Sequence, residues 1–177
     1  MTRNIIIGNA ICFMGSVIMA AMGLIKDKKK FLIAQSGMNV FFIVGNLFLN
    51  GITGAIANAC TMARNIVCLK WNLNTPLKIL FISLQIVLTI IARPASMLMW
   101  LPIFGTCIFT WFLDTENAVL LRILIIVTQM MWLVYDIHII NYATVPFDVA
   151  ACITNSFALA GIVKKQHSED TDDKEDA

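Results

Sequence analysis

The chain has 177 residues, of which 59% are hydrophobic and only 14% are charged. Because soluble domains carry about 25% charged residues, this composition excludes an ordinary water-soluble protein. The 13 basic and 11 acidic residues give a net charge of +2 without a basic patch on one soluble face, so nucleic acid is not an expected partner.

Long apolar segments with short polar breaks occupy residues 5 to 163. A hydrocarbon core of about 30 Å requires about 20 helical residues, and a helix satisfies its own backbone amides in lipid. The sequence therefore predicts an all-α, polytopic membrane protein. Its seven expected transmembrane helices cover 5–25, 31–49, 52–69, 77–92, 96–113, 118–138 and 146–163. Asn50-Gly51 is typical of a tight turn, and Pro146 suits the first turn of a helix.

Basic residues predict the orientation. Ten of them fall at the ends of the helices that would share one side of the membrane, or in the tail beyond: Lys26, Lys28, Lys29, Lys30, Lys70, Lys78, Arg122, Lys164, Lys165 and Lys174. The opposite side has only Arg3 and Arg93. Because basic residues stay in the cytoplasm, the N-terminus is expected outside and the C-terminus inside.

The predicted layout of three helices, one linker helix and three more helices suggests an internal repeat. A transmembrane domain of residues 1–165 would contain repeat one (5–69), a linker helix (77–92) and repeat two (96–163). The linker inverts the second repeat, so a 3+1+3 arrangement gives two parallel triple-helix bundles. Six of the eleven acidic residues lie in the last nine positions, so 166–177 is expected to be an acidic, disordered cytoplasmic tail.

Polar residues inside the apolar segments define the candidate site, because in lipid they usually face protein or a wet cavity. The second helix carries a polar face that includes Gln35 and Asn46, and Thr61 lies on the polar face of the third. The candidate substrate-binding residues are Asn39, Asn58, Arg64, Asn65, Gln129, Trp132 and Asn155. The amides would hydrogen-bond a polar solute, Arg64 would favour an anionic group and Trp132 would stack on it. The alternative is that the amides only bond helix to helix.

Chemical catalysis is not expected. Asp136 and Asp148 are interpreted as solvated helix ends rather than paired carboxylates. The two histidines lie outside any metal-binding spacing, and no nucleophile motif or phosphate-binding glycine loop occurs. The five cysteines lie inside apolar segments, as packing residues do. We therefore expect no enzyme activity, no catalytic residue, no metal and no cofactor.

Two segments carry a family resemblance. The first is Gln35…Asn39-Val-Phe-Phe…Gly51-Ile-Thr53-Gly54-Ala…Arg64-Asn65, and the second is Leu101-Pro102-Ile-Phe-Gly105-Thr106…Thr110-Trp111 followed by Arg122 and Trp132-Leu-Val-Tyr135. Over residues 5–164 the chain resembles the YgjV-type bacterial inner-membrane proteins, which implies the bacterial inner membrane and a lipid bilayer as its surroundings. Their layout is similar to that of the SWEET, PQ-loop and nicotinamide-riboside transporter group.

Two functions follow from these observations. The first is a carrier or facilitator of a small polar solute, with its site near the midplane between the two bundles. The second is a non-transporting membrane scaffold or interaction protein whose amides only hold helices together. Either function is compatible with a homo-oligomer, which the sequence neither predicts nor excludes.

Overall fold

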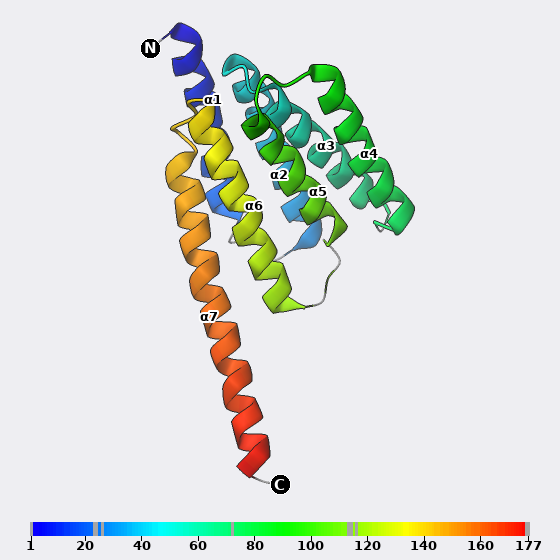
Figure 1. Cartoon of the computed structure of the whole chain (residues 1–177), viewed down its shortest axis with the longest axis vertical. Helices are drawn as coiled ribbons and strands as arrows, with labels where there is room; N and C mark the ends of the chain where they lie inside the picture. Colours follow the sequence, from blue (N-terminus) through cyan, green and yellow to red (C-terminus); the bar gives the residue numbers. More distant parts are fainter. Residues whose placement is uncertain are drawn as a thin grey trace.

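The computed structural model describes residues 2–22, 25, 27–71, 73–112, 115 and 117–175, apart from the side chains of residues 28 and 165–175. The described residues form seven α-helices and one short 3₁₀ helix, with no strand (Figure 1). The elements are α1 (Arg3–Met22), α2 (Lys28–Phe48), α3 (Ile52–Cys68), α4 (Thr75–Ala92), η1 (Met97–Trp100), α5 (Leu101–Trp111), α6 (Ala118–His138) and α7 (Val145–Glu175). The prediction of an all-α fold is confirmed.

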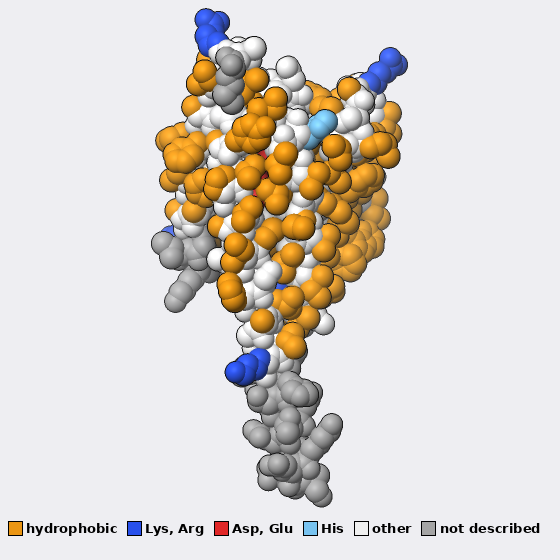
Figure 2. Space-filling model, turned by 60° about the vertical axis from the view of Figure 1, so that its left-hand side comes forward, with side chains coloured by type: hydrophobic (Ala, Val, Ile, Leu, Met, Phe, Trp, Pro, Cys, Tyr) orange, Lys and Arg blue, Asp and Glu red, His pale blue; other side chains and the backbone are white. Residues whose placement is uncertain are grey.

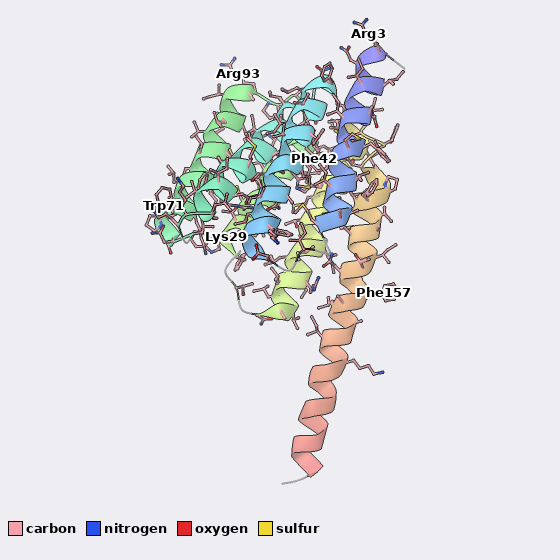
Figure 3. The ribbon with its side chains drawn as sticks, turned by 180° about the vertical axis from the view of Figure 1, so that it is seen from behind. Arg3, Lys29, Phe42, Trp71, Arg93 and Phe157 are labelled. Carbon is pink, nitrogen blue, oxygen red and sulfur yellow. The ribbon has the colours of Figure 1, made fainter. Side chains whose placement is uncertain are left out.

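Within the described part of the chain, five helices are long and apolar enough to cross a membrane. They are α1, α2 from Lys29, α4, α6 and the part of α7 from Val145 to Lys164. Successive α-helices alternate in direction, so the two termini lie at opposite ends of the bundle (Figure 1). Figure 2 shows hydrophobic side chains over the body and basic side chains at its ends. Figure 3 places Arg3 and Arg93 at one end and Lys29 and Trp71 at the other, as the charge pattern predicts.

The fifth predicted span differs from a single helix over 96–113. It consists of the 3₁₀ turn η1 followed by α5, which has only 11 residues. Pro102 lies in the first turn of α5, where its missing N–H does no harm, so the regular helix starts there. Together η1 and α5 rise roughly 25 Å. The first helix is described to Met22, and residues 23, 24, 113 and 114 of the predicted spans lie outside the described part.

The structure continues α7 as a helix to Glu175, and the predicted disorder of the tail stays a prediction. Extending an existing helix requires no new nucleation, and the tail contains good helix formers such as Lys, Gln and Glu. Its backbone is therefore helical over residues 166–175, while residues 176 and 177 lie outside the described part.

Most helices pack against the helices that precede and follow them in the chain. α2 packs against both α1 and α3, and α6 packs against both α5 and α7. α4 packs against α3 and α5, where Thr106 of α5 donates a hydrogen bond to Gln85 of α4 over 3.1 Å. The relation of the two groups of three as parallel repeats stays a prediction.

One tyrosine ties the two halves together. Tyr135 of α6 is fully buried, and its hydroxyl accepts a hydrogen bond of 2.9 Å from the N–H of Gly54. The same hydroxyl donates to Asn46 Oδ1 over 3.3 Å. The turn between α2 and α3 contains Asn50 with a φ of 57°, which confirms the Asn50-Gly51 turn. This turn is therefore held against α6.

Candidate functional site

A cavity of about 380 Å³ lies inside the bundle, lined by residues of α1, α2, α3, α5, α6, α7 and the turn between α6 and α7. This volume is in the range of small-molecule sites, about 300 to 1,000 Å³. Six of the seven predicted site residues line it: Asn39, Asn58, Arg64, Gln129, Trp132 and Asn155. The sequence pattern thus located residues that the fold brings to one space, although their separation in the chain reaches 116 positions.

Arg64 lies at the wall of this cavity and is only 3% exposed. Its Nη1 donates to Thr110 Oγ1 of α5 over 2.7 Å, and its Nη2 donates to Asn65 Oδ1 over 3.3 Å. Its buried Nε has no hydrogen-bond partner. Thus neutral oxygen atoms, rather than an acidic side chain, surround the guanidinium among the described residues.

Asn65, the seventh predicted residue, holds two lining residues in place by hydrogen bonds without lining the cavity. It is 1% exposed, and its Nδ2 donates to Gln35 Oε1 of α2 over 2.8 Å. Its Oδ1 accepts the bond from Arg64. Asn65 therefore orients Arg64 and connects α2 to α3, while it is not among the residues that line the cavity.

Asn39 and Asn58 present amides to the cavity in two different ways. Asn58 Nδ2 donates to the carbonyl of Gly54 on its own helix over 2.9 Å. Asn39 is 1% exposed, and its buried Nδ2 has no hydrogen-bond partner. Because an unsatisfied buried donor costs about 1 to 3 kcal/mol, Asn39 is the amide with the most to gain from a bound acceptor.

Trp132 packs edge-on against Tyr135, with 5.8 Å between the ring centroids.

The α6 and α7 side of the cavity is more fully paired. Gln129 Nε2 donates to Asp148 Oδ1 over 2.6 Å. Arg122 Nη1 donates to Asn155 Oδ1 over 2.6 Å, while Asn155 Nδ2 donates to the carbonyl of Ala151 over 2.8 Å. Gln129 therefore holds the carboxyl group of Asp148 at the cavity wall, and Asn155 fixes Arg122, which is not among the lining residues.

Asp136 and Asp148 correct the sequence interpretation. They were expected to be solvated helix ends, but each is only 4% exposed and both line the cavity. The turn between α6 and α7 folds inward over them. Asn141 Nδ2 donates to Asp136 Oδ1 over 3.0 Å, and Thr144 Oγ1 donates to Asp136 Oδ2 over 2.8 Å. Side chains of the turn, rather than water, thus donate the hydrogen bonds to the Asp136 carboxyl group.

Asn141 and Thr144 line the cavity and were missed by the sequence reading. Asn9 of α1 holds their turn in place, because its Nδ2 donates to the carbonyl of Ile140 and its Oδ1 accepts from the N–H of Ala143, both over 2.9 Å. Ile140 has a φ of 62°, which is uncommon for a β-branched residue. The signal available in the sequence was two short polar residues five and eight positions after Asp136.

The cavity has an acidic and a basic end. Figure 1 places the start of α3, the end of α6 and the start of α7 at the same end of the bundle. From the helical rise, Asp136 and Asp148 lie about 3 to 5 Å from that end, and Arg64 lies about 18 Å from it. Among the described residues, no group of three or more His, Cys, Asp or Glu could hold a metal ion. The wall offers hydrogen-bond donors and acceptors, such as Asn39, Gln129 and Asn155, to the space inside.

The segments of the sequence that carry the family resemblance meet in this structure, at the bonds from Arg64 to Thr110 and from Gly54 to Tyr135. The chain matches the model of the Imp-YgjV family, described as bacterial inner membrane protein, over residues 6–166. No curated protein and no solved structure matches the chain. The family match covers most of the chain, which therefore belongs to the YgjV family of bacterial inner membrane proteins.

Proposed function

We propose that this protein is a carrier or facilitator of a small polar solute rather than an enzyme or a purely structural protein. The observation that carries the proposal is the cavity of about 380 Å³ inside an apolar bundle, with polar side chains from α2, α3, α6 and α7 in its wall. Polar side chains within a membrane are costly and usually mark a pathway or a site. The proposed site lies near the midplane, between the groups α1–α3 and α5–α7.

The solute would bind to the hydrogen-bond donors that have no partner within the protein. Asn39 Nδ2 and Arg64 Nε are buried and unpartnered, so each supplies an N–H to an oxygen atom of the solute. Arg64 would favour a solute with an anionic group, because charge-assisted hydrogen bonds are stronger than neutral ones. Trp132 supplies an aromatic wall that can pack on a planar or apolar part of the solute.

The proposed orientation places the N-terminus outside and the C-terminus in the cytoplasm, so that the Arg64 end of the cavity faces the cytoplasm. The separation of Lys29 from Arg3 and Arg93 supports it (Figure 3). The lipid would contact the apolar outer surface, such as Phe157 of α7, which is 76% exposed.

Purified protein in liposomes tests the proposal. Uptake of radiolabelled sugars, nucleosides, carboxylic acids and vitamin-like solutes is measured, together with the thermal shift that each solute causes in detergent. We expect one class to be taken up and to raise the unfolding temperature, and Asn39→Leu to reduce both effects. Val40→Leu is the matched control, because Val40 is the next residue on α2 and is 48% exposed on the outer surface. Uptake and thermal shift absent for every class would overturn the proposal.

A scaffold role is the second candidate, and the polar bonds between helices favour it. Gln35 with Asn65 and Arg122 with Asn155 each join two helices. Such bonds contribute about 1 kcal/mol or less in a membrane. If these bonds were the whole purpose of the polar residues, Asn39→Leu would change no flux. A transport defect in a stably folded Asn39→Leu variant would reject the scaffold role.

A further inference from the structure

Two carboxyl groups face each other at the acidic end of the cavity. Asp136 lies near the end of α6 and Asp148 in the first turn of α7. Each is 4% exposed, both line the cavity, and their side chains are within hydrogen-bonding reach of each other. Carboxylate oxygens only accept hydrogen bonds, so two facing carboxylates have no bond between them unless one carries a proton.

The protein supplies donors to three of the four carboxyl oxygens. Asn141 and Thr144 donate to the two oxygens of Asp136, and Gln129 donates to Asp148 Oδ1. The fourth oxygen, Asp148 Oδ2, is buried and has no donor. A single proton on this oxygen, donated to Asp136, would complete the hydrogen bonding of the pair.

The charge of the pair leads to the same requirement. No described Lys, Arg or His interacts with either carboxyl group. The titratable groups that face the pair are Cys12 on α1, Tyr135 on α6 and Cys152 on α7, and none of them is a cation. Two uncompensated negative charges inside a membrane protein are strongly unfavourable, and carboxylates that share a site cannot easily ionise together. One bound proton reduces the charge from −2 to −1, and the three donors stabilise the charge that remains.

The free oxygens do not suit a metal ion. Among the buried side-chain oxygen atoms that the structure describes around the pair, Asp148 Oδ2 and Asn141 Oδ1 have no partner. Hard cations such as Mg²⁺ and Ca²⁺ take about six or more oxygen ligands. The vacant hydrogen-bonding capacity between the two carboxyl groups matches one proton.

We propose that Asp136 and Asp148 form a proton-binding site in the cavity wall, through which solute transport is coupled to protons. This inference rests on the proposed carrier function. In the step, the O–H bond at Asp148 breaks, the proton passes to water in the cavity, and the pair goes from −1 to −2. Gln129 links the proton to the solute, because it lines the cavity and donates to Asp148. A more negative Asp148 holds that amide more strongly and withdraws it from the solute.

Infrared spectroscopy of the whole protein in lipid nanodiscs tests the proton site without any solute. A protonated carboxyl gives a C=O stretch that shifts in D₂O and disappears when the proton leaves. We expect such a band in the wild type, its loss as pH is raised, and its absence in Asp148→Asn and in Asp136→Asn. The control is Asp27→Asn, an exposed N-cap of α2 where Asn also caps well. A wild type without the band, or the band retained in both variants, would overturn the proposal.

Two further measurements cover the other outcomes. If either Asn variant fails to fold, Thr144→Val removes a donor to Asp136 and should shift the band in frequency, and an unshifted band counts against the site. The titration is also repeated with NaCl and with choline chloride. A band that sodium alone abolishes at fixed pH would identify a sodium site and overturn the proton site.

Coupling is tested by repeating the liposome screen of sugars, nucleosides and carboxylic acids with an acidic exterior and an alkaline interior. We expect the gradient to increase uptake several-fold in the wild type and to have no effect in Asp148→Asn. Gradient-independent uptake in the wild type would overturn the coupling. No uptake under any condition would overturn the carrier function, while the infrared band would still report separately on the proton site.

Discussion

Arg64 of α3 donates a hydrogen bond of 2.7 Å from its Nη1 to Thr110 Oγ1 of α5. The pair joins the two halves of the chain beside the cavity, and no acidic side chain neutralises the guanidinium among the described residues. The guanidinium is instead hydrogen-bonded by two neutral acceptors, the hydroxyl of Thr110 and the amide oxygen of Asn65. This leaves Arg64 Nε free to receive a negatively charged or strongly accepting group.

Arg64→Lys should therefore weaken the binding of carboxylic acids more than that of sugars in the liposome and thermal-shift screen. Lysine keeps the charge but cannot bond Thr110 and Asn65 while it also presents a third N–H in a fixed plane. Loss of one charge-assisted hydrogen bond, about 1.5 to 3 kcal/mol, corresponds to at least a tenfold weaker affinity. Arg93→Lys, at the exposed end of α4, is the control and should change nothing. An equal loss for acidic and neutral solutes would contradict an anion-selective role for Arg64.

Asn39 and Asn65 should separate binding from stability. Asn65→Leu removes bonds to Gln35 and Arg64, so it should lower the free energy of unfolding by about 1 to 3 kcal/mol. Asn39→Leu removes a buried amide whose Nδ2 is unpartnered, so stability should be unchanged or higher while solute binding falls. Thermal unfolding in detergent measures the first effect and the ligand-induced shift measures the second. If Asn39→Leu were as destabilising as Asn65→Leu, Asn39 would be a structural residue.

Gly54→Ala should destabilise the contact between α3 and α6. An added Cβ would lie 2.6 Å from both Asn46 Oδ1 and Tyr135 Oη, so the hydrogen-bonded cluster must open. Overpacking of this kind costs about 1 to 3 kcal/mol. The matched control is Gly37→Ala on α2, where a Cβ meets nothing within 4 Å. That control should be neutral or stabilising by about 0.5 to 1 kcal/mol, because alanine favours a helix. Equal unfolding temperatures for the two variants would argue against the Tyr135 contact.

Reporter fusions should give a cytoplasmic C-terminus. A fluorescent protein fused after residue 177 should mature, and alkaline phosphatase at the same position should be inactive, because the ends with ten basic residues are retained in the cytoplasm. Active phosphatase at this position would reverse the orientation of the cavity and place Arg64 towards the outside.

The periodicity of the sequence was sufficient to predict the helices and most of the polar residues that line the cavity. Apolar segments of helical length have few alternatives in lipid, and Asn39, Asn58 and Arg64 interrupt them at positions that must face protein. The helical period places such residues on one face, and the fold then turns these faces towards the same cavity. Asn65 shows the limit of this reasoning, because a shared helical face does not tell a lining residue from one that holds its neighbour.

The acidic end of the cavity was misread for a related reason. Asp136 and Asp148 lie beside a turn, and carboxylates at helix ends are ordinarily solvated by water. Their burial depends on the fold of residues 139–144 and on Asn9, which lies more than 130 positions away in the chain and pins that turn. Contacts between residues this far apart in the chain arise from the tertiary packing of α1 against the α6–α7 turn. They cannot be predicted from the hydropathy of the sequence. The break of the fifth span at η1 is likewise a local effect of Pro102 within an apolar segment.

The most direct test of the account is the reactivity of cysteines placed on two sides of α7. Asn155→Cys faces the cavity, and Ile153→Cys lies on the outer surface, where Ile153 is 50% exposed. Both are treated in membranes with a small, charged methanethiosulfonate, and the reaction of the native cysteines in the unsubstituted protein is subtracted. We expect fast labelling at position 155, slowed by a transported solute, and little labelling at position 153, which faces lipid. Labelling at 153 with none at 155 would contradict a water-accessible cavity inside the bundle.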